Sequence, residues 1–291
     1  MLLLLLVSLL WAFSPGLIKH YLGDLNSTHS PLIAALRLGL TLLVFAPFLR
    51  FRLLAASTYA WLAGIGAIQF GLMYLLYLQA FKHLQGHEVY LFTILTPLYV
   101  VLLDSAIANK LAPRHAVAAL LSVIGAALAL TRGVGTANVM TGFLFVQGAN
   151  LCFAAGQIAY KRTRPALAEK ADDAQLFAWL ALGGFVATTL VAAPLTKWTA
   201  FAPTPTQWLV LAFLGVVASG GGFFLWNRGL AQVNAGTLAV FNNAKIPLGV
   251  IATLVLFGER PERPWHLGGS LALLAVAVWV AESGKPAKDP A

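Results

Sequence analysis

Long apolar runs recur along the whole chain, and they constrain its fold more than any other feature of the sequence. Each run is roughly 18 to 22 residues long, the length that a helix needs to cross a hydrocarbon core of about 30 Å. Only 10% of the 291 residues are charged, whereas a soluble domain carries about a quarter. The sequence therefore predicts an all-α polytopic membrane protein without a sizeable soluble domain.

The runs divide into ten candidate transmembrane helices. They are expected near residues 2–18, 31–49, 58–81, 87–107, 113–131, 139–160, 174–195, 206–227, 236–257 and 265–281. Segments rich in proline, glycine or charge separate them, including a break from Asp24 to Pro31. The first run lacks the basic region and the cleavage pattern of a signal peptide, so we interpret it as the first span. The polar end, residues 283–291, is expected to be disordered.

The second half of the chain echoes the first. Glycine and proline recur in matched spans at one constant offset, which pairs Gly71 with Gly221, Gly86 with Gly236 and Pro97 with Pro247. Five spans in each half, residues 1–135 and 136–282, make the second half begin on the opposite side of the membrane. The sequence thus predicts two inverted five-helix repeats. Inverted repeats place a substrate site near the midplane at their interface, and they work by alternating access.

The distribution of basic residues predicts the orientation in the membrane. If the N-terminus lies inside, the inner loops hold eleven Lys and Arg residues and the outer loops hold six. This excess places both termini in the cytoplasm, in a plasma (inner) membrane. It also accounts for the net charge of +9, so nucleic acid is not expected as a partner.

Neither a metal site nor a cofactor is expected. The one cysteine, Cys152, cannot form a disulfide framework within one chain. The histidines lack the spacing of a metal site beyond a single pair, His83 and His87. The chain also has no Walker motif, so we do not expect it to hydrolyse ATP itself.

Several motifs resemble the EamA-type members of the drug/metabolite transporter superfamily over essentially the whole chain. The resemblance rests on the paired halves, the opening LLVSLLWAFSPGLIKH, Arg37 within AALRLGL, the prolines of spans four and nine, and LVLFGERPERPW (Leu254–Trp265). The first half departs from the pattern, with Asn109-Lys110 where Gly-Glu is usual. The resemblance implies ten helices and a central cavity between the halves. It implies as cargo a small metabolite such as an amino acid, an amine, a carboxylate or a related solute.

Lys245 lies deep in an apolar run, about 14 Å from Gly236 along a helix that rises about 1.5 Å per residue. A lysine at the centre of a span costs about 2.5 to 3.5 kcal/mol on insertion scales, so it normally faces a cavity or a partner. We expect Lys245, assisted by Asn242 on the same helix face, to bind an anionic group of the substrate. The alternative is an internal partner that locks the halves together. Pro247 and Pro97 each free a carbonyl at membrane depth and are expected at hinges.

Other polar side chains within the spans are candidates for the same site. Glu88 either exchanges protons or meets a substrate amine, or it is an interfacial carboxylate at a helix N-terminus. Arg37 is expected to snorkel or to brace the cavity, which is a structural role. Polar-tipped side chains in or near spans one, three, six and eight complete the set: Trp11, Gln69, Tyr74, Tyr77, Asn150, Gln157, Trp226 and Asn227. Each of these alone is more often a packing residue or a residue of the membrane interface, because Trp and Tyr are typical of the aromatic belts.

The sequence therefore predicts a secondary transporter that moves a small polar metabolite by alternating access, with protons as a candidate coupling ion. One alternative is an anion exchanger of the nucleotide-sugar or sugar-phosphate kind, which needs more basic residues at cavity depth than Lys245 and Arg37. A membrane-embedded enzyme needs clustered acids, histidines or a nucleophile at one depth, and the spans do not offer them. A passive channel is a third class, which saturable counterflow would distinguish.

Overall fold

Ten helical spans follow one another in the described part of the chain, residues 1–130, 139–257 and 264–283 of a computed structural model. The first five consist of α1 (Leu2–Trp11) with α2 (Ser14–Tyr21), α3 (Gly23–Phe45), α4 (Ala56–Gly66) with α5 (Met73–Ala80), α6 (Gly86–Thr93) with α7 (Thr96–Ala108), and α8 (Pro113–Ala129). The second five consist of α9 (Val139–Thr163), α10 (Asp173–Leu195), α11 (Pro205–Ala212) with α12 (Gly222–Leu230), α13 (Ala235–Phe257) and α14 (Pro264–Glu282). Short 3-10 turns lie at Ala46–Phe48, Pro165–Leu167 and Trp198–Ala200.

Length and composition agree with a membrane-spanning bundle. Eight of the described segments are long and apolar enough to cross a membrane, and α8 is a shorter apolar helix. The segment α13 has 23 residues and a similar apolar character. The predicted all-α polytopic fold is confirmed.

Three predictions fall outside the described residues: the disordered tail from residue 284 onward, the boundary between residues 135 and 136, and the Gly-Glu step at residues 258 and 259.

The predicted break from Asp24 to Pro31 is present as a kink at His29, with helix on both sides of it. The sequence placed the start of the second span at Pro31, but α3 begins at Gly23 and contains Pro31. Proline lacks the N–H that would bond four residues back, and it normally kinks or ends a helix. Here it kinks the helix, because His29 leaves helical geometry (φ −124°, ψ 28°) while Leu32 and Ile33 continue the span as buried residues.

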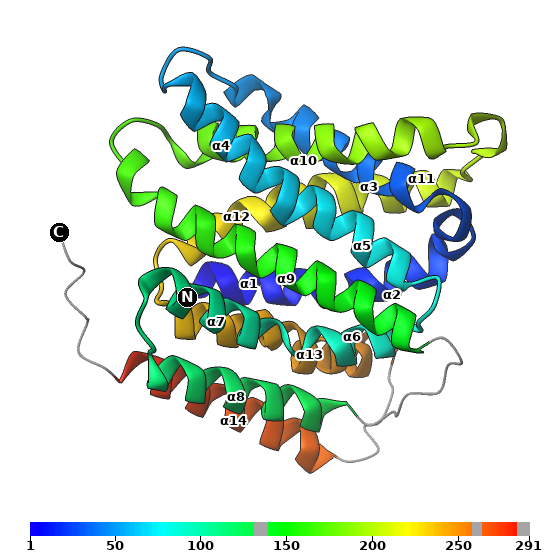
Figure 1. Cartoon of the computed structure of the whole chain (residues 1–291). Helices are drawn as coiled ribbons and strands as arrows, with labels where there is room; N and C mark the ends of the chain where they lie inside the picture. The colour runs from blue at the N-terminus through cyan, green and yellow to red at the C-terminus, as the bar shows by residue number, and fades with distance from the viewer. Residues whose placement is uncertain (131–138, 258–263, 284–291) are drawn as a thin grey trace.

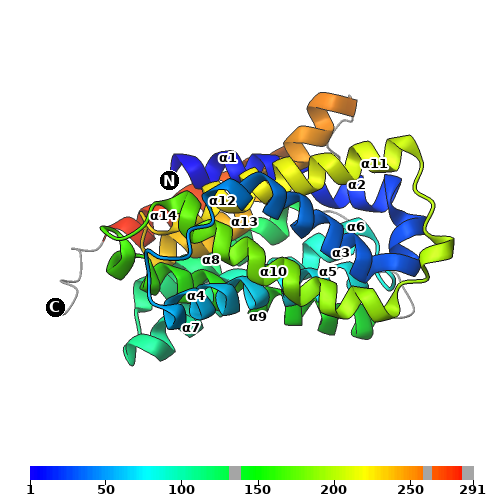
Figure 2. The same cartoon turned by 90° about the horizontal axis from the view of Figure 1, so that it is seen from above.

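The helices of the two halves interleave in the bundle (Figure 1). The segment α3 packs against α10, α8 against α14, and α7 against α13. The first span, through α1, packs against α12 and α13, and the sixth span, α9, packs against α5 and α7. The start of α1 and the end of α14 lie at the same end of the bundle in both views (Figure 1 and Figure 2).

Glycines let α4 and α10 approach each other closely. A Cβ atom added at Gly66 would lie 1.8 Å from the carbonyl oxygen of Leu180, and one added at Gly183 would lie 1.9 Å from that of Ala63. The two backbones therefore touch directly, as small residues permit between helices in a membrane.

Two spans are broken, and two contain π-helical turns. The first span breaks between Trp11 and Ser14, and the fourth breaks between Thr93 and Thr96. The residues Ala67–Leu72 of span three and Phe213–Gly221 of span eight are π-helical, a geometry that is frequent at functional sites. 

The two predicted hinge prolines behave differently. Pro97 follows the break in span four, and the Thr93 carbonyl that it frees accepts a hydrogen bond from Thr96 Oγ1 at 2.7 Å. Pro247 lies within the continuous helix α13.

A candidate binding cavity between the halves

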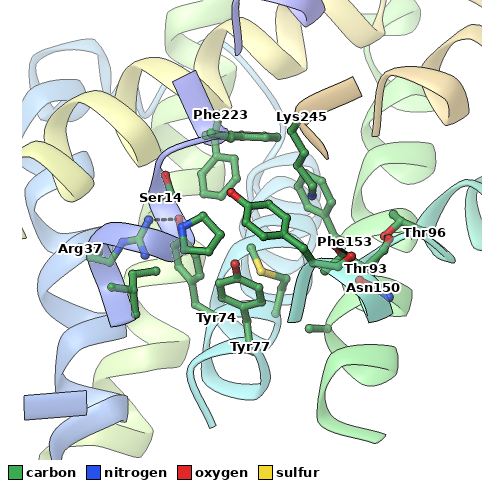
Figure 3. A pocket seen from close by; sticks show the side chains of 16 residues that line it. Ser14, Arg37, Tyr74, Tyr77, Thr93, Thr96, Asn150, Phe153, Phe223 and Lys245 are labelled. Carbon is green, nitrogen blue, oxygen red and sulfur yellow. Dashed lines mark hydrogen bonds between the residues drawn. The ribbon is translucent and has the colours of Figure 1, made fainter. Parts of the chain in front are cut away.

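A cavity of about 90 Å³, partly open to solvent, lies beside the two helix breaks. Its lining comes from α1, α2, α3, α5, α6 and α7 of the first half and from α9, α12 and α13 of the second half. Figure 3 shows the cavity with Arg37 on one side and Lys245 on the other.

Lys245 reaches the cavity from α13, as the sequence predicted (Figure 3). Among the described residues, its ammonium has no hydrogen bond, ion pair or cation–π contact. An ionic group that is taken out of water without a partner carries a free-energy penalty of several kcal/mol. The ammonium is therefore positioned to bind an anion that enters the cavity.

Arg37 also lines the cavity, and it does not snorkel to the membrane surface, because only 2% of it is exposed. Its Nη2 donates to the hydroxyl of Tyr74 at 2.6 Å and to Ser219 Oγ at 3.1 Å. Its guanidinium carbon lies 4.3 Å from the centre of the Tyr74 ring, a cation–π distance. Its Nε and Nη1 are buried and have no hydrogen-bond partner in the part of the chain that the structure describes.

The lining contains two cations, Lys245 and Arg37, and no Asp or Glu among the described residues. Because opposite charges attract far more strongly in a low-dielectric interior than in water, this lining favours a negatively charged ligand.

Four of the other predicted site residues also line the cavity: Trp11, Tyr74, Tyr77 and Asn150. Trp11 donates from Nε1 to the Ala218 carbonyl at 2.8 Å, so its indole is fixed. Asn150 donates to the Phe92 carbonyl at 3.0 Å, next to the break in span four.

The remaining amides lie behind the cavity wall and bind one another. Gln69 Nε2 donates to Asn227 Oδ1 at 2.9 Å and so joins the two halves. Gln157 Oε1 accepts from Trp226 Nε1 and from Asn242 Nδ2, both at 3.1 Å. These five side chains are buried and are not part of the cavity lining.

Glu88 lies at the N-terminus of α6. Its Oε2 accepts the backbone N–H of Gln85 at 2.8 Å, and the two residues form a capping box. The side chain is 1% exposed and does not line the cavity. Glu88 thus lies at a helix N-terminus, where the helix dipole stabilises a carboxylate, but it is buried and not interfacial.

Several lining residues were not among the candidates from the sequence. Ser14 and Thr96 lie at the two helix breaks, and Tyr90 donates to the Ala12 carbonyl, which ties the broken spans together. A sequence signal for two of them existed. Ser14 and Thr96 each directly precede a proline inside an apolar run, where a hydroxyl is placed next to freed backbone groups.

Comparison with known proteins agrees with this architecture. The sequence pattern of the EamA-like transporter family matches residues 1–131 and 140–281. This chain belongs to that family. It is therefore a multi-pass membrane protein that transports a small molecule, and the family and the relatives below point to a transporter and not to an enzyme.

Relatives with assigned names span the whole chain. A biotin transporter of Escherichia coli K12 is 40% identical over 285 residues, which cover 96% of this chain and 92% of the relative. A probable biotin transporter of Pseudomonas aeruginosa is 37% identical over 290 residues, which cover 97% of each. A solved crystal structure superposes with a TM-score of 0.74 over 97% of this chain and 96% of its own, at 21% identity, which shows the fold alone.

Proposed function

We propose that this chain is a secondary carrier that moves biotin, or a closely similar carboxylate, across the membrane by alternating access. The observation that carries the proposal is the pair of cavity cations, Lys245 and Arg37, in a lining without an acid among the described residues. Biotin is a carboxylate at neutral pH, and the relatives named as biotin transporters cover nearly the whole chain.

Lys245 is the proposed binding group for the carboxylate. It presents donors only, and a carboxylate presents acceptors only, so the two are complementary. In this proposal Asn242 does not contact the substrate but fixes the position of α13, the helix that carries Lys245. Its amide is engaged by Gln157 and by the Leu238 carbonyl, which holds this part of α13 in place beneath Lys245.

The carrier mechanism rests on two inverted repeats, residues 1–135 and 136–282. The family pattern matches two consecutive stretches of the chain, which supports this division. The packing supports this division too. The first span packs through α1 against α12 and α13 of the second half, and the first span of the second half, α9, packs against α5 and α7 of the first half. The third span of each proposed repeat contains a π-helical stretch, at Ala67–Leu72 and Phe213–Gly221.

Sidedness and coupling remain part of the proposal. The start of α1 and the end of α14 share one end of the bundle, which supports termini on the same side, and the excess of basic residues favours the cytoplasm for both. Protons are the proposed coupling ion, but the described lining offers no carboxylate to exchange them.

An exchanger of nucleotide sugars or sugar phosphates is a second candidate, because the two cavity cations also suit a phosphate. The names of the relatives favour biotin over this alternative. The two candidates are distinguished by testing which unlabelled compound, biotin or a sugar phosphate, competes for transport.

Transport by purified protein in liposomes tests the proposal. Vesicles loaded with unlabelled biotin are expected to accumulate labelled biotin by counterflow, and to saturate. Lys245→Gln is expected to lose most of this uptake, whereas Lys110→Gln, which changes an exposed lysine, retains it. Counterflow of a sugar phosphate in place of biotin would select the alternative. Absence of counterflow with either compound would overturn the carrier proposal.

A further inference from the structure

The two cavity cations differ in how far their hydrogen-bonding capacity is already used. Lys245 has no partner among the described residues, whereas Arg37 has the Tyr74 ring, the Tyr74 hydroxyl and Ser219. The guanidinium is therefore partly stabilised by the protein, and the ammonium depends on a ligand. This difference implies that the two cations bind different parts of one substrate.

The directions of the hydrogen bonds around Arg37 follow from the number of hydroxyl protons. Ser219 has one proton, which it donates to the Leu214 carbonyl at 2.7 Å. The contact of 2.9 Å between Ser219 Oγ and the Tyr74 hydroxyl is therefore donated by Tyr74. Tyr74 accepts from Arg37 Nη2, and its oxygen retains one acceptor position.

Unused donors and acceptors thus lie together on the Arg37 side of the cavity. Arg37 Nε and Nη1 are donors without a partner in the described chain, and Ser14 Oγ is buried and equally without one. Ser14, Arg37, Tyr74 and Tyr77 all line the cavity, and Figure 3 draws Ser14 and Arg37 on the side away from Lys245. Hydroxyl groups can donate and accept, so this wall offers both kinds of hydrogen bond. We call Arg37, Ser14, Tyr74 and Tyr77 the arginine wall.

A carboxylate only accepts hydrogen bonds and cannot use the acceptors of the arginine wall. A cyclic urea, in contrast, has one carbonyl that accepts and two N–H groups that donate, and biotin carries such a ring at the end opposite its carboxylate. We propose that the arginine wall binds the urea ring of the substrate, with the carbonyl at Arg37 and the N–H groups at the hydroxyls, while Lys245 binds the carboxylate. This inference rests on the proposed function and assigns the orientation of the substrate within the same cavity.

The orientation makes the arginine wall a determinant of specificity. A site built to bond polar groups rejects analogues that lack them, because its own buried groups are then left unpaired. Acyl chains that carry a carboxylate without a urea ring are therefore expected to bind weakly, although Lys245 accepts their charge.

Equilibrium binding of biotin and of biotin amide, which keeps the ring but has no charge, tests the orientation. In the native protein, biotin is expected to bind about 10- to 100-fold more tightly than the amide, the range for a hydrogen bond to a charged group. In Lys245→Gln, the two ligands are expected to bind equally. In Arg37→Lys, both are expected to weaken about tenfold with their ratio unchanged.

A second variant covers the case in which the buried Arg37→Lys protein does not fold. Ser14→Ala removes only a hydroxyl, and it is expected to weaken both ligands by about 2- to 10-fold, again with their ratio unchanged. Ser27→Ala, Arg52→Lys and Lys110→Gln change exposed residues and are the matched controls, with native affinities expected for both ligands. Melting temperatures of all variants establish that each protein is folded.

The possible results are distinguishable. If the preference for biotin over its amide disappears in Arg37→Lys or Ser14→Ala and persists in Lys245→Gln, the carboxylate lies at the arginine wall and the orientation is reversed. If neither variant of the wall alters either affinity, the wall takes no part in binding. If the native protein binds neither ligand, the proposed function itself fails, and this inference fails with it.

Discussion

The contact between α4 and α10 predicts that adding one methyl group at Gly66 destabilises the protein. In Gly66→Ala the new Cβ would lie 1.8 Å from the Leu180 carbonyl oxygen and 2.6 Å from the Leu180 Cα. Ordinary contact begins at 3.4 Å, so the helices must separate by about 1.6 Å. Overpacking typically costs about 1 to 3 kcal/mol. Because backbone atoms cannot rotate away as a side chain does, we expect the upper end of that range.

The helix itself opposes part of this penalty. Alanine is favoured over glycine within a helix by about 1 kcal/mol, which leaves a net loss of about 2 kcal/mol for Gly66→Ala. Gly64, two residues earlier in α4, is exposed and has nothing within 4 Å of an added Cβ. Gly64→Ala therefore gains the helix-forming preference of alanine without a steric clash, and we expect its stability to match or exceed that of the native protein.

Denaturation of the purified protein in detergent micelles, followed by circular dichroism or by intrinsic tryptophan fluorescence, measures the difference between the two variants. The lower stability of Gly66→Ala relative to Gly64→Ala is the expected result. Equal stability of the two variants would contradict this prediction, because it would mean that α4 and α10 do not meet backbone to backbone.

Two further predictions concern stability at the polar contacts. Asp104→Asn removes an ion pair of 2.8 Å with Arg162, and because both side chains are partly exposed we expect a loss below about 1 kcal/mol in the same denaturation assay; a larger loss would show that the pair is buried more deeply than the structure indicates. Gln157→Leu leaves the buried donors of Trp226 and Asn242 without their shared acceptor, and we expect a loss of about 1 to 3 kcal/mol. Native stability of that variant would contradict the hydrogen-bond network.

The sequence predicts the fold well because the length of an apolar run and the requirement for internal backbone hydrogen bonds leave few choices in a membrane. The segment from Asp24 to Pro31 shows the limit of local signals, because the kink lies inside it but helix continues on both sides. Pro31 is a helix breaker by its chemistry, but the packing of Leu32 and Ile33 in the core continues the span through the kink.

The candidate site was harder to predict, because depth in the membrane does not determine which way a side chain points. Lys245 was found from its depth, since a charge at that position needs a cavity or a partner. Gln157 and Asn242 lie at similar depth, and yet they bond to each other behind the cavity wall. The packing of α9 against α12 and the hydrogen bond from α13 to α9 distinguish the two outcomes, and both join residues far apart in the sequence.

The position of Arg37 was also difficult to predict from the sequence. Its distance from the start of the apolar run at Pro31 suggested a structural role, either snorkelling to the interface or bracing the cavity. In the structure, α3 begins at Gly23, eight residues earlier than Pro31, so Arg37 lies deeper in its helix than the sequence indicated. Its burial and its hydrogen bonds to Tyr74 and Ser219 exclude snorkelling and agree with the alternative in which Arg37 braces the cavity.

A structure of the protein with bound biotin tests directly whether the cavity between the halves binds a carboxylate at Lys245. Ligand density is expected between α3 and α13, with the carboxylate within hydrogen-bonding distance of Lys245 Nζ. Density that lies outside this cavity, or a carboxylate that lies away from Lys245, would contradict this expectation.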